Sequence, residues 1–120
     1  MEVIPKSACP PFVAPDNAII RERRAPRNSS VRHRSLAEAA IPPGSFVREH
    51  CHVRTEEPHP IVSGRGLMRV DGEERAVGPG DTVVIRPGQR HRIATLGDAP
   101  LVMLVPCAPG YEAEDQLMTE

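Results

Sequence analysis

The sequence predicts an all-β fold, a small barrel or sandwich built from short antiparallel strands. Two observations support this prediction. The 14 prolines and 9 glycines divide the 120 residues into short pieces. From Ser29 onwards, short apolar or alternating runs recur between turn signals such as Pro-Pro-Gly, Asp-Gly and Gly-Pro-Gly-Asp. Many short strands separated by Gly- and Pro-rich turns are typical of sandwiches and barrels.

The elements follow from these runs in chain order. Residues 1–28 are Pro-rich and irregular, so we expect an N-terminal arm without a core of its own. Residues 29–109 are expected to form the barrel and residues 110–120 a C-terminal tail, all within one domain. The runs expected to form strands are residues 30–41, 45–53, 60–64, 66–70, 74–77, 81–86, 91–96 and 100–106.

Two local features refine this assignment. Asp71-Gly72 separates two alternating runs and predicts a two-residue hairpin, because glycine tolerates the positive φ of a type I′ turn. Residues 36–40 (LAEAA) and 111–118 (YEAEDQLM) are the segments whose composition suits a helix. Since Pro42 follows the first of them after a single residue, Ile41, we interpret that segment as the end of a strand.

Composition excludes several function classes. The net charge is −1, and the basic run at residues 21–27 lacks the aromatic neighbours that stack on bases, so no nucleic-acid partner is expected. No run approaches the roughly 20 apolar residues that cross a membrane. Three cysteines without a CxxC pattern argue against a disulfide framework. We therefore expect a reduced, cytoplasmic protein.

Histidines are concentrated in EHCHVRTEEPHP, residues 49–60. In a strand, His50 and His52 project to one face and Cys51 to the other. Histidines with nearby acids are compatible with a metal site or with a polar surface loop. The choice between them depends on the spacing of the surrounding residues.

That spacing resembles the two characteristic motifs of the cupin superfamily over about residues 29–109. The first motif is Gly44-x5-His-x-His-x4-Glu-x6-Gly64, and the second is Gly80-x5-Arg-Pro-Gly-x2-His91. The resemblance implies a cupin double-stranded β-helix, a jelly-roll barrel. It also implies a divalent metal, with zinc favoured and iron, manganese or nickel as alternatives. The residues at the family's metal-ligand positions are His50, His52, Glu57 and His91.

The segment Glu57-Pro58-His59-Pro60 departs from the family pattern. Its two prolines remove two backbone donors on the same side, which predicts a bulged or locally detached part of the barrel. His59 shares parity with Glu57 and should face inward. It would then replace or join Glu57 as a ligand, act as an acid or base near the metal, or fill space. Whichever of Glu57 and His59 does not bind the metal is the expected catalytic base.

Strand parity also suggests substrate-binding residues. Phe46 and Arg48 lie four and two residues before His50, respectively, and are expected on its face. Arg48 would then hold an anionic group through bidentate hydrogen bonds, unless the strand starts late and Arg48 lies at the rim.

The resemblance leaves three functions open, because the cupin fold names no reaction. We favour a zinc-dependent enzyme of bacterial specialised metabolism that acts on a small organic substrate, in which the metal is a Lewis acid. An iron or nickel dioxygenase and a non-catalytic binding module or accessory domain are the alternatives. We also expect a homodimer, in which residues 17–22 add a strand to the partner or pack across it.

Overall fold

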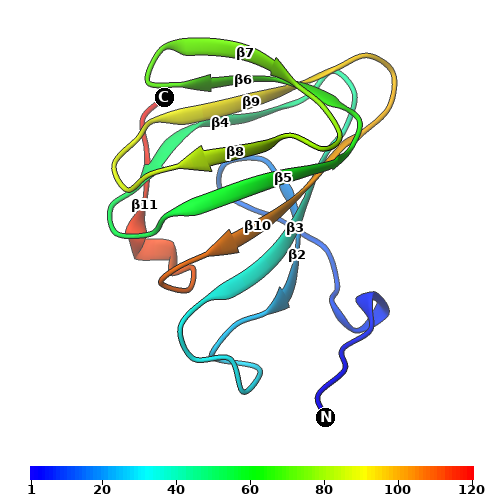
Figure 1. The fold of residues 1–120 in the computed structure, drawn as a ribbon, viewed down its shortest axis with the longest axis vertical. Coiled ribbons are helices and arrows are strands. Elements are labelled where there is room, and N and C mark those ends of the chain that lie inside the picture. The colour runs from blue at the N-terminus through cyan, green and yellow to red at the C-terminus, as the bar shows by residue number, and fades with distance from the viewer.

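The computed structural model describes all residues, 1–120, and forms two antiparallel sheets that face each other (Figure 1). The six-stranded sheet has the order β1-β2-β3-β10-β5-β8, and the five-stranded sheet has the order β11-β4-β9-β6-β7. The strands are β1 (Phe12–Val13), β2 (Ile19–Arg24), β3 (Ser35–Ile41), β4 (Phe46–His52), β5 (Glu57–Ser63), β6 (Arg65–Val70), β7 (Glu73–Val77), β8 (Thr82–Ile85), β9 (His91–Leu96), β10 (Leu101–Cys107) and β11 (Gln116–Met118).

The all-β jelly roll is confirmed. All eight expected strands are present as β3 to β10, and the only helical elements are two short 3-10 turns, η1 (Lys6–Ala8) and η2 (Ala113–Asp115). None of these turns is long or apolar enough to cross a membrane. Residues 36–40 lie within β3, in agreement with their interpretation as strand.

The hairpin between β6 and β7 also forms as expected. Asp71 and Gly72 both have positive φ, 48° and 86°, and the flanking residues Val70 and Glu73 pair directly. Positive φ at both central positions is the signature of the type I′ turn, whose twist matches that of the strands it joins. Gly64 is similarly constrained, since a Cβ there would lie 2.2 Å from the Pro100 carbonyl oxygen.

The segment before residue 28 is continuous with the barrel. β2 pairs with β3 along Ile19 to Arg24, and β1 pairs with β2 at the edge of the same sheet. Ala18 and Ala25, at the two ends of β2, are buried. The strand that we expected to add to a partner copy is therefore added within the same chain.

The core fills the space between the two sheets. Ile41 and Leu101 have no exposed surface, and they belong to a cluster contributed by both sheets. The other buried members of this cluster are Ala18, Ala39, Val47, Ile61, Met68, Val77, Ile93 and Met103.

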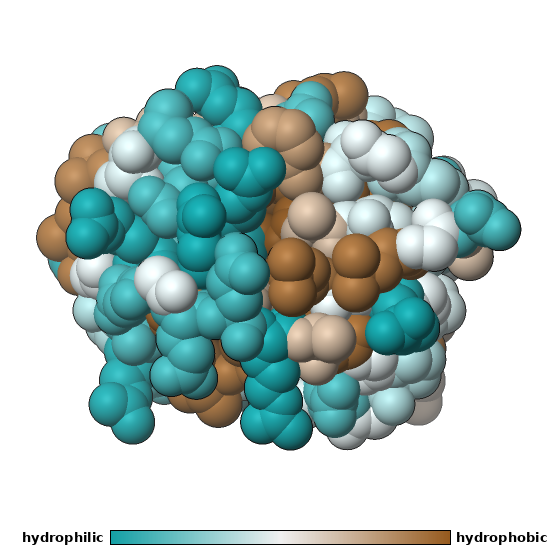
Figure 2. Space-filling model, turned by 90° about the horizontal axis from the view of Figure 1, so that it is seen from above, coloured by the Kyte–Doolittle hydropathy of each residue, from teal (hydrophilic) through white to brown (hydrophobic).

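Viewed from above, the outside is largely hydrophilic, with a compact group of hydrophobic side chains near the middle of that face (Figure 2). The homodimer stays a prediction.

Candidate metal centre

Strand β4 brings two histidines into the interior through an irregular register. Its pairing with β9 shifts between Val47 and His50, so an extra residue is accommodated between them. As a result Val47, His50 and His52 are all buried, at 4% exposure each. Val47 and His50 are three positions apart, an odd offset, so the inward face changes parity at the bulge.

This change of parity places Phe46 and Arg48 outside the cavity, which corrects the expectation that they lie on the inward face with His50. Arg48 is exposed, and its guanidinium donates to the Glu120 carbonyl oxygen at 2.8 Å. The Phe46 ring packs under the guanidinium of Arg92, whose central carbon lies 4.0 Å from the ring centroid. Alternate residues share a face only in a regular strand, and the bulge interrupts this alternation in β4.

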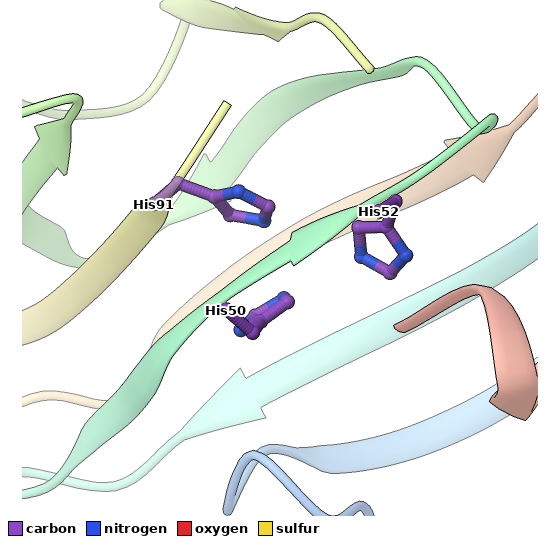
Figure 3. A group of neighbouring side chains, drawn as sticks. All are labelled: His50, His52 and His91. Carbon is purple, nitrogen blue, oxygen red and sulfur yellow. The ribbon is translucent and has the colours of Figure 1, made fainter. Parts of the chain in front are cut away.

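Three buried histidines meet in the interior. His50 pairs directly with His91 across β4 and β9, and their ring centroids lie 4.3 Å apart. One potential ligand atom from each of His50, His52 and His91 lies within 4.8 Å of the others. Figure 3 shows His50 and His52 on one strand and His91 on another, with the rings gathered in one interior space. Histidines up to 41 residues apart in the sequence thus form one compact group.

Backbone carbonyls fix two of these rings in the same way. His50 Nδ1 lies 2.7 Å from the Arg48 carbonyl oxygen, and His91 Nδ1 lies 3.0 Å from that of Gln89. Because a carbonyl only accepts, each Nδ1 must carry the proton, and each Nε2 then has a free lone pair in the neutral ring. His91 Nε2 is buried and has no partner.

Burial keeps these imidazoles neutral. It lowers the pKa of His91 to about 3, and it also lowers the pKa of His50. A neutral imidazole with a free Nε2 and a carbonyl-bound Nδ1 is the form in which histidine binds a metal. His50 and His91 are in this form, and together with His52, which offers a ligand atom within 4.8 Å of theirs, they fit a divalent metal ion; the identity of that metal stays a prediction.

Glu57 occupies the interior beside this group. Its Oε1 lies 2.8 Å from His52 Nε2, and its Oε2 lies 2.5 Å from His59 Nε2. Burial by itself raises the pKa of Glu57, but hydrogen bonds from His52 and His59 outweigh it and hold the pKa well below its usual value. Glu57 is thus an ionised carboxylate between two histidines, and its role as a fourth metal ligand stays a prediction.

The proline-flanked segment behaves as its sequence predicts. His59 is buried with Glu57, while Pro58 between them is exposed. On one side, Glu57 to Pro60 pair continuously with β8. On the other side, β5 pairs with β10 only from Ile61 onwards, with a separate bridge from Glu56 to Ala108. The two missing N–H groups fall on this side, where the ladder is interrupted.

The comparisons with known proteins agree with this geometry. A family model described as the cupin domain (Cupin_2) matches residues 37–107, more than half of the chain. The chain belongs to the cupin family. An uncharacterized protein of Methanocaldococcus jannaschii is 40% identical to this cupin over 110 residues, which cover 92% of this chain and 88% of the relative. The tetracenomycin polyketide synthase protein TcmJ of Streptomyces glaucescens is 31% identical over 80 residues, which cover 64% of this chain and 54% of TcmJ.

Solved structures share the fold of this cupin at low sequence identity. A predicted oxalate decarboxylase from Thermotoga maritima superimposes with a TM-score of 0.79 and 22% identity, covering 90% of this chain and 99% of the other. Streptomyces Pac13, described as a nucleoside dehydratase and solved with uridine, superimposes with a TM-score of 0.81 and 16% identity, covering 100% of this chain and 92% of the other. At these identities the likeness shows the fold alone.

The cavity also contains polar residues that the sequence did not indicate. Asp16 Oδ2 lies 3.5 Å from His50 Nε2 and accepts a hydrogen bond from Gln116 Nε2 at 3.0 Å. Tyr111 donates its hydroxyl hydrogen to Gln116 Oε1 at 2.8 Å. These residues come from the N-terminal segment and the C-terminal tail, outside both motifs, and no local pattern marks them.

Cys107, at the end of β10, is a further hydrogen-bond partner of Glu57. Its thiol donates to Glu57 Oε1 at 3.4 Å. Burial, followed by the charge of Glu57, strongly raises the pKa of Cys107, so this cysteine remains a thiol and is not a nucleophile.

Proposed function

We propose that this cupin is a zinc-dependent enzyme in which His50, His52 and His91 hold the metal and His59 acts as the general base on a small organic substrate. The observation that carries the proposal is the pairing of His59 with Glu57. The carboxylate binds His59 Nε2, and His59 Nδ1 is buried without a partner. One nitrogen is therefore held, and the other is left to exchange a proton.

The carboxylate suits His59 to this role. An ionised Glu57 can only accept, so it fixes the tautomer with the proton on Nε2 and leaves the lone pair on Nδ1. When Nδ1 takes up a proton, the adjacent negative charge stabilises the imidazolium. His52 and Cys107 also donate toward Glu57 Oε1, which keeps this carboxylate in position.

The three-histidine group is suited to zinc, which prefers nitrogen donors and keeps an open position in catalytic sites. When bound, the metal would act as a Lewis acid and polarise a carbonyl oxygen of the substrate. Proton abstraction from the carbon next to that carbonyl would then fall to His59. The reaction class is therefore proton transfer of the kind that isomerases, dehydratases and cyclases use.

The named relatives support a small organic substrate. Pac13 is described as a nucleoside dehydratase, the Thermotoga protein as a predicted oxalate decarboxylase, and TcmJ belongs to a polyketide synthase. Two of the three come from Streptomyces, which supports our proposal of specialised metabolism. The match to the Methanocaldococcus jannaschii relative covers 92% of this chain and the match to TcmJ covers 64%, so the proposal names a type of reaction and no particular pathway.

The test has two parts. Elemental analysis of protein purified without added metal should find zinc, whereas stoichiometric iron with oxygen consumption would favour the dioxygenase alternative. The zinc-loaded protein should catalyse deuterium exchange at the carbons next to the carbonyl of cyclopentanone, followed by NMR. His59→Gln should slow this exchange roughly 10²–10⁴-fold, the usual contribution of a general base, and should retain zinc.

A matched control is available at His33, the one histidine outside the site, which is exposed. His33→Gln should leave both zinc content and exchange unchanged. Undiminished exchange in His59→Gln would contradict the proposed role of His59, and loss of zinc in that variant would make His59 a ligand instead.

A further inference from the structure

A second carboxylate lies in the cavity beside His50. Asp16, in the turn before β2, is only 8% exposed, and its Oδ2 lies 3.5 Å from His50 Nε2. Its Oδ1 accepts from the Ala18 backbone N–H at 3.1 Å, and its Oδ2 accepts from Gln116 at 3.0 Å. Its own carbonyl accepts from the Arg48 backbone N–H at 2.8 Å. These contacts hold the Asp16 carboxylate at the metal centre.

The charges inside the cavity therefore balance once a metal is bound. Neutral imidazoles contribute no charge, and the two carboxylates of Asp16 and Glu57 offset the two positive charges of a divalent ion. Arg27 is the only lysine or arginine that lines the cavity; it is exposed and ion-paired with Glu22. No unpaired positive charge remains to receive an anionic ligand.

The rest of the cavity wall is mainly apolar. The cavity volume is about 100 Å³, enough for a small ring but not for an extended chain. Burying an anion in such surroundings is costly unless a positive charge compensates it. The apolar side chains that line the cavity include Ala37, Ala39, Val47, Met68, Ile93, Met103 and Val105.

We propose that the cavity selects uncharged, mainly apolar ligands that carry a carbonyl or hydroxyl oxygen, and that Asp16 is the residue that excludes anions. This inference rests on the proposed metal site, because the charge balance includes the divalent ion. It also replaces the expectation that Arg48 grips an anionic substrate, since Arg48 lies outside the cavity.

The test compares two ligands of the same shape and different charge. Benzamide and benzoate are titrated into zinc-loaded protein near neutral pH by isothermal calorimetry. The wild type should bind benzamide at least about tenfold more tightly than benzoate, as expected for an uncompensated charge close to a carboxylate. Asp16→Asn should reduce this preference by about tenfold, because it removes one negative charge and keeps the side-chain shape.

Asp98→Asn is the matched control, since Asp98 is exposed in the turn between β9 and β10 and does not line the cavity. It should keep the wild-type preference. Asp16→Ser is a second neutral variant, with a hydroxyl that can accept from Ala18, if Asp16→Asn fails to fold.

The outcomes separate this inference from the proposed function on which it rests. Benzoate binding as tightly as benzamide to the wild type would overturn the inference, and so would the absence of binding by either compound. An unchanged preference in a folded, zinc-loaded Asp16 variant would remove the role of Asp16. A wild-type protein that takes up no zinc would instead refute the metal site, and the inference with it.

Discussion

His50 and His91 on one wall of the cavity are held in a different way from His59 on the other, while His52 shares the Glu57 carboxylate with His59. On β4 and β9, His50 and His91 each bond through Nδ1 to the backbone carbonyl of the residue two positions earlier. On β5, His59 bonds through Nε2 to the side chain of the residue two positions earlier, Glu57. The sequence offset is the same, but a neutral carbonyl holds the first pair and an ionised carboxylate holds His59.

One residue type thus takes two roles within one cavity. A carbonyl fixes the tautomer with the proton on Nδ1 and leaves the Nε2 lone pair free, while burial keeps the ring neutral, which suits a metal ligand. A carboxylate stabilises the protonated form, which suits a base. The strands that carry these histidines also differ in their pairing. β4 pairs with β9 on both sides of one bulge, whereas residues Glu57–Pro60 of β5 pair only with β8.

Zinc affinity should change most when one of the two carbonyl-held histidines is replaced. His50→Gln or His91→Gln should weaken zinc binding by more than about 100-fold, because loss of a ligand exceeds the usual 10–100-fold effect of its supporting groups. Competition with a chromogenic chelator measures the affinity, with His33→Gln as control. An affinity within tenfold of the wild type in either variant would place the metal elsewhere.

Glu57→Gln tests whether the Glu57 carboxylate orients His59. If Glu57 orients His59, this variant should keep zinc within about tenfold, the lower limit for a supporting group, and should slow cyclopentanone exchange on the order of 10²-fold. The amide keeps the shape and loses the charge that stabilises protonated His59. Loss of zinc from this variant would instead identify Glu57 as the fourth ligand, as the family resemblance implies.

The stability of the metal-free protein should fall as the pH is lowered. Burial lowers the pKa of His91 to about 3 and also lowers the pKa of His50, whereas unfolded histidine titrates near pH 6.5. Between these limits the unfolded state binds protons that the native state does not. Each of these two histidines should therefore lower the free energy of unfolding by about 1.4 kcal/mol for each pH unit below about pH 6.5.

Urea unfolding of the metal-free protein at about pH 7 and pH 5.5 measures how the free energy of unfolding changes with pH. The ordinary histidine pKa near 6.5 describes the unfolded state in this comparison. The low pKa of Glu57 acts in the same direction, but only below the usual carboxyl range near 4.5, so this window isolates the histidines. His91→Gln should show a shallower decline, and a decline as steep as in the wild type would contradict the assignment.

Much of this comparison was predictable from the sequence because it depends on local alternation. The strands, the Asp71-Gly72 hairpin and the inward position of His59 all follow from period-two patterns and turn residues. Phe46 and Arg48 were misplaced because a bulge in β4 changes the parity of the strand, and no proline or glycine marks it.

Other parts of the site depend on contacts that no local pattern encodes. Asp16 reaches His50 because β2 joins β3, and Gln116 reaches Asp16 because β11 pairs with β4. These partners are 34 and 100 residues apart in the sequence. A single sequence gives their residue types but not their proximity.

The smallest expected effect concerns the two prolines beside His59. Backbone N–H groups alternate in direction, so Pro58 and Pro60 lie on the same side as Glu56, toward β10, where the ladder is interrupted. Pro58→Ala or Pro60→Ala should lower the free energy of unfolding by about 0.4–1 kcal/mol, through the greater freedom of the unfolded chain. Urea unfolding measures this change, and a gain in stability would show that the restored N–H finds a partner on β10.

The most direct test of the central claim is ¹⁵N NMR of the histidine side chains before and after zinc is added. We expect zinc to shift the Nε2 signals of His50 and His91 while their Nδ1 atoms stay protonated. His59 should keep its proton on Nε2 and an unprotonated Nδ1 in both states. A metal-induced shift of a His59 nitrogen comparable to those of His50 and His91 would show that His59 is a ligand, and would contradict the division between the two walls.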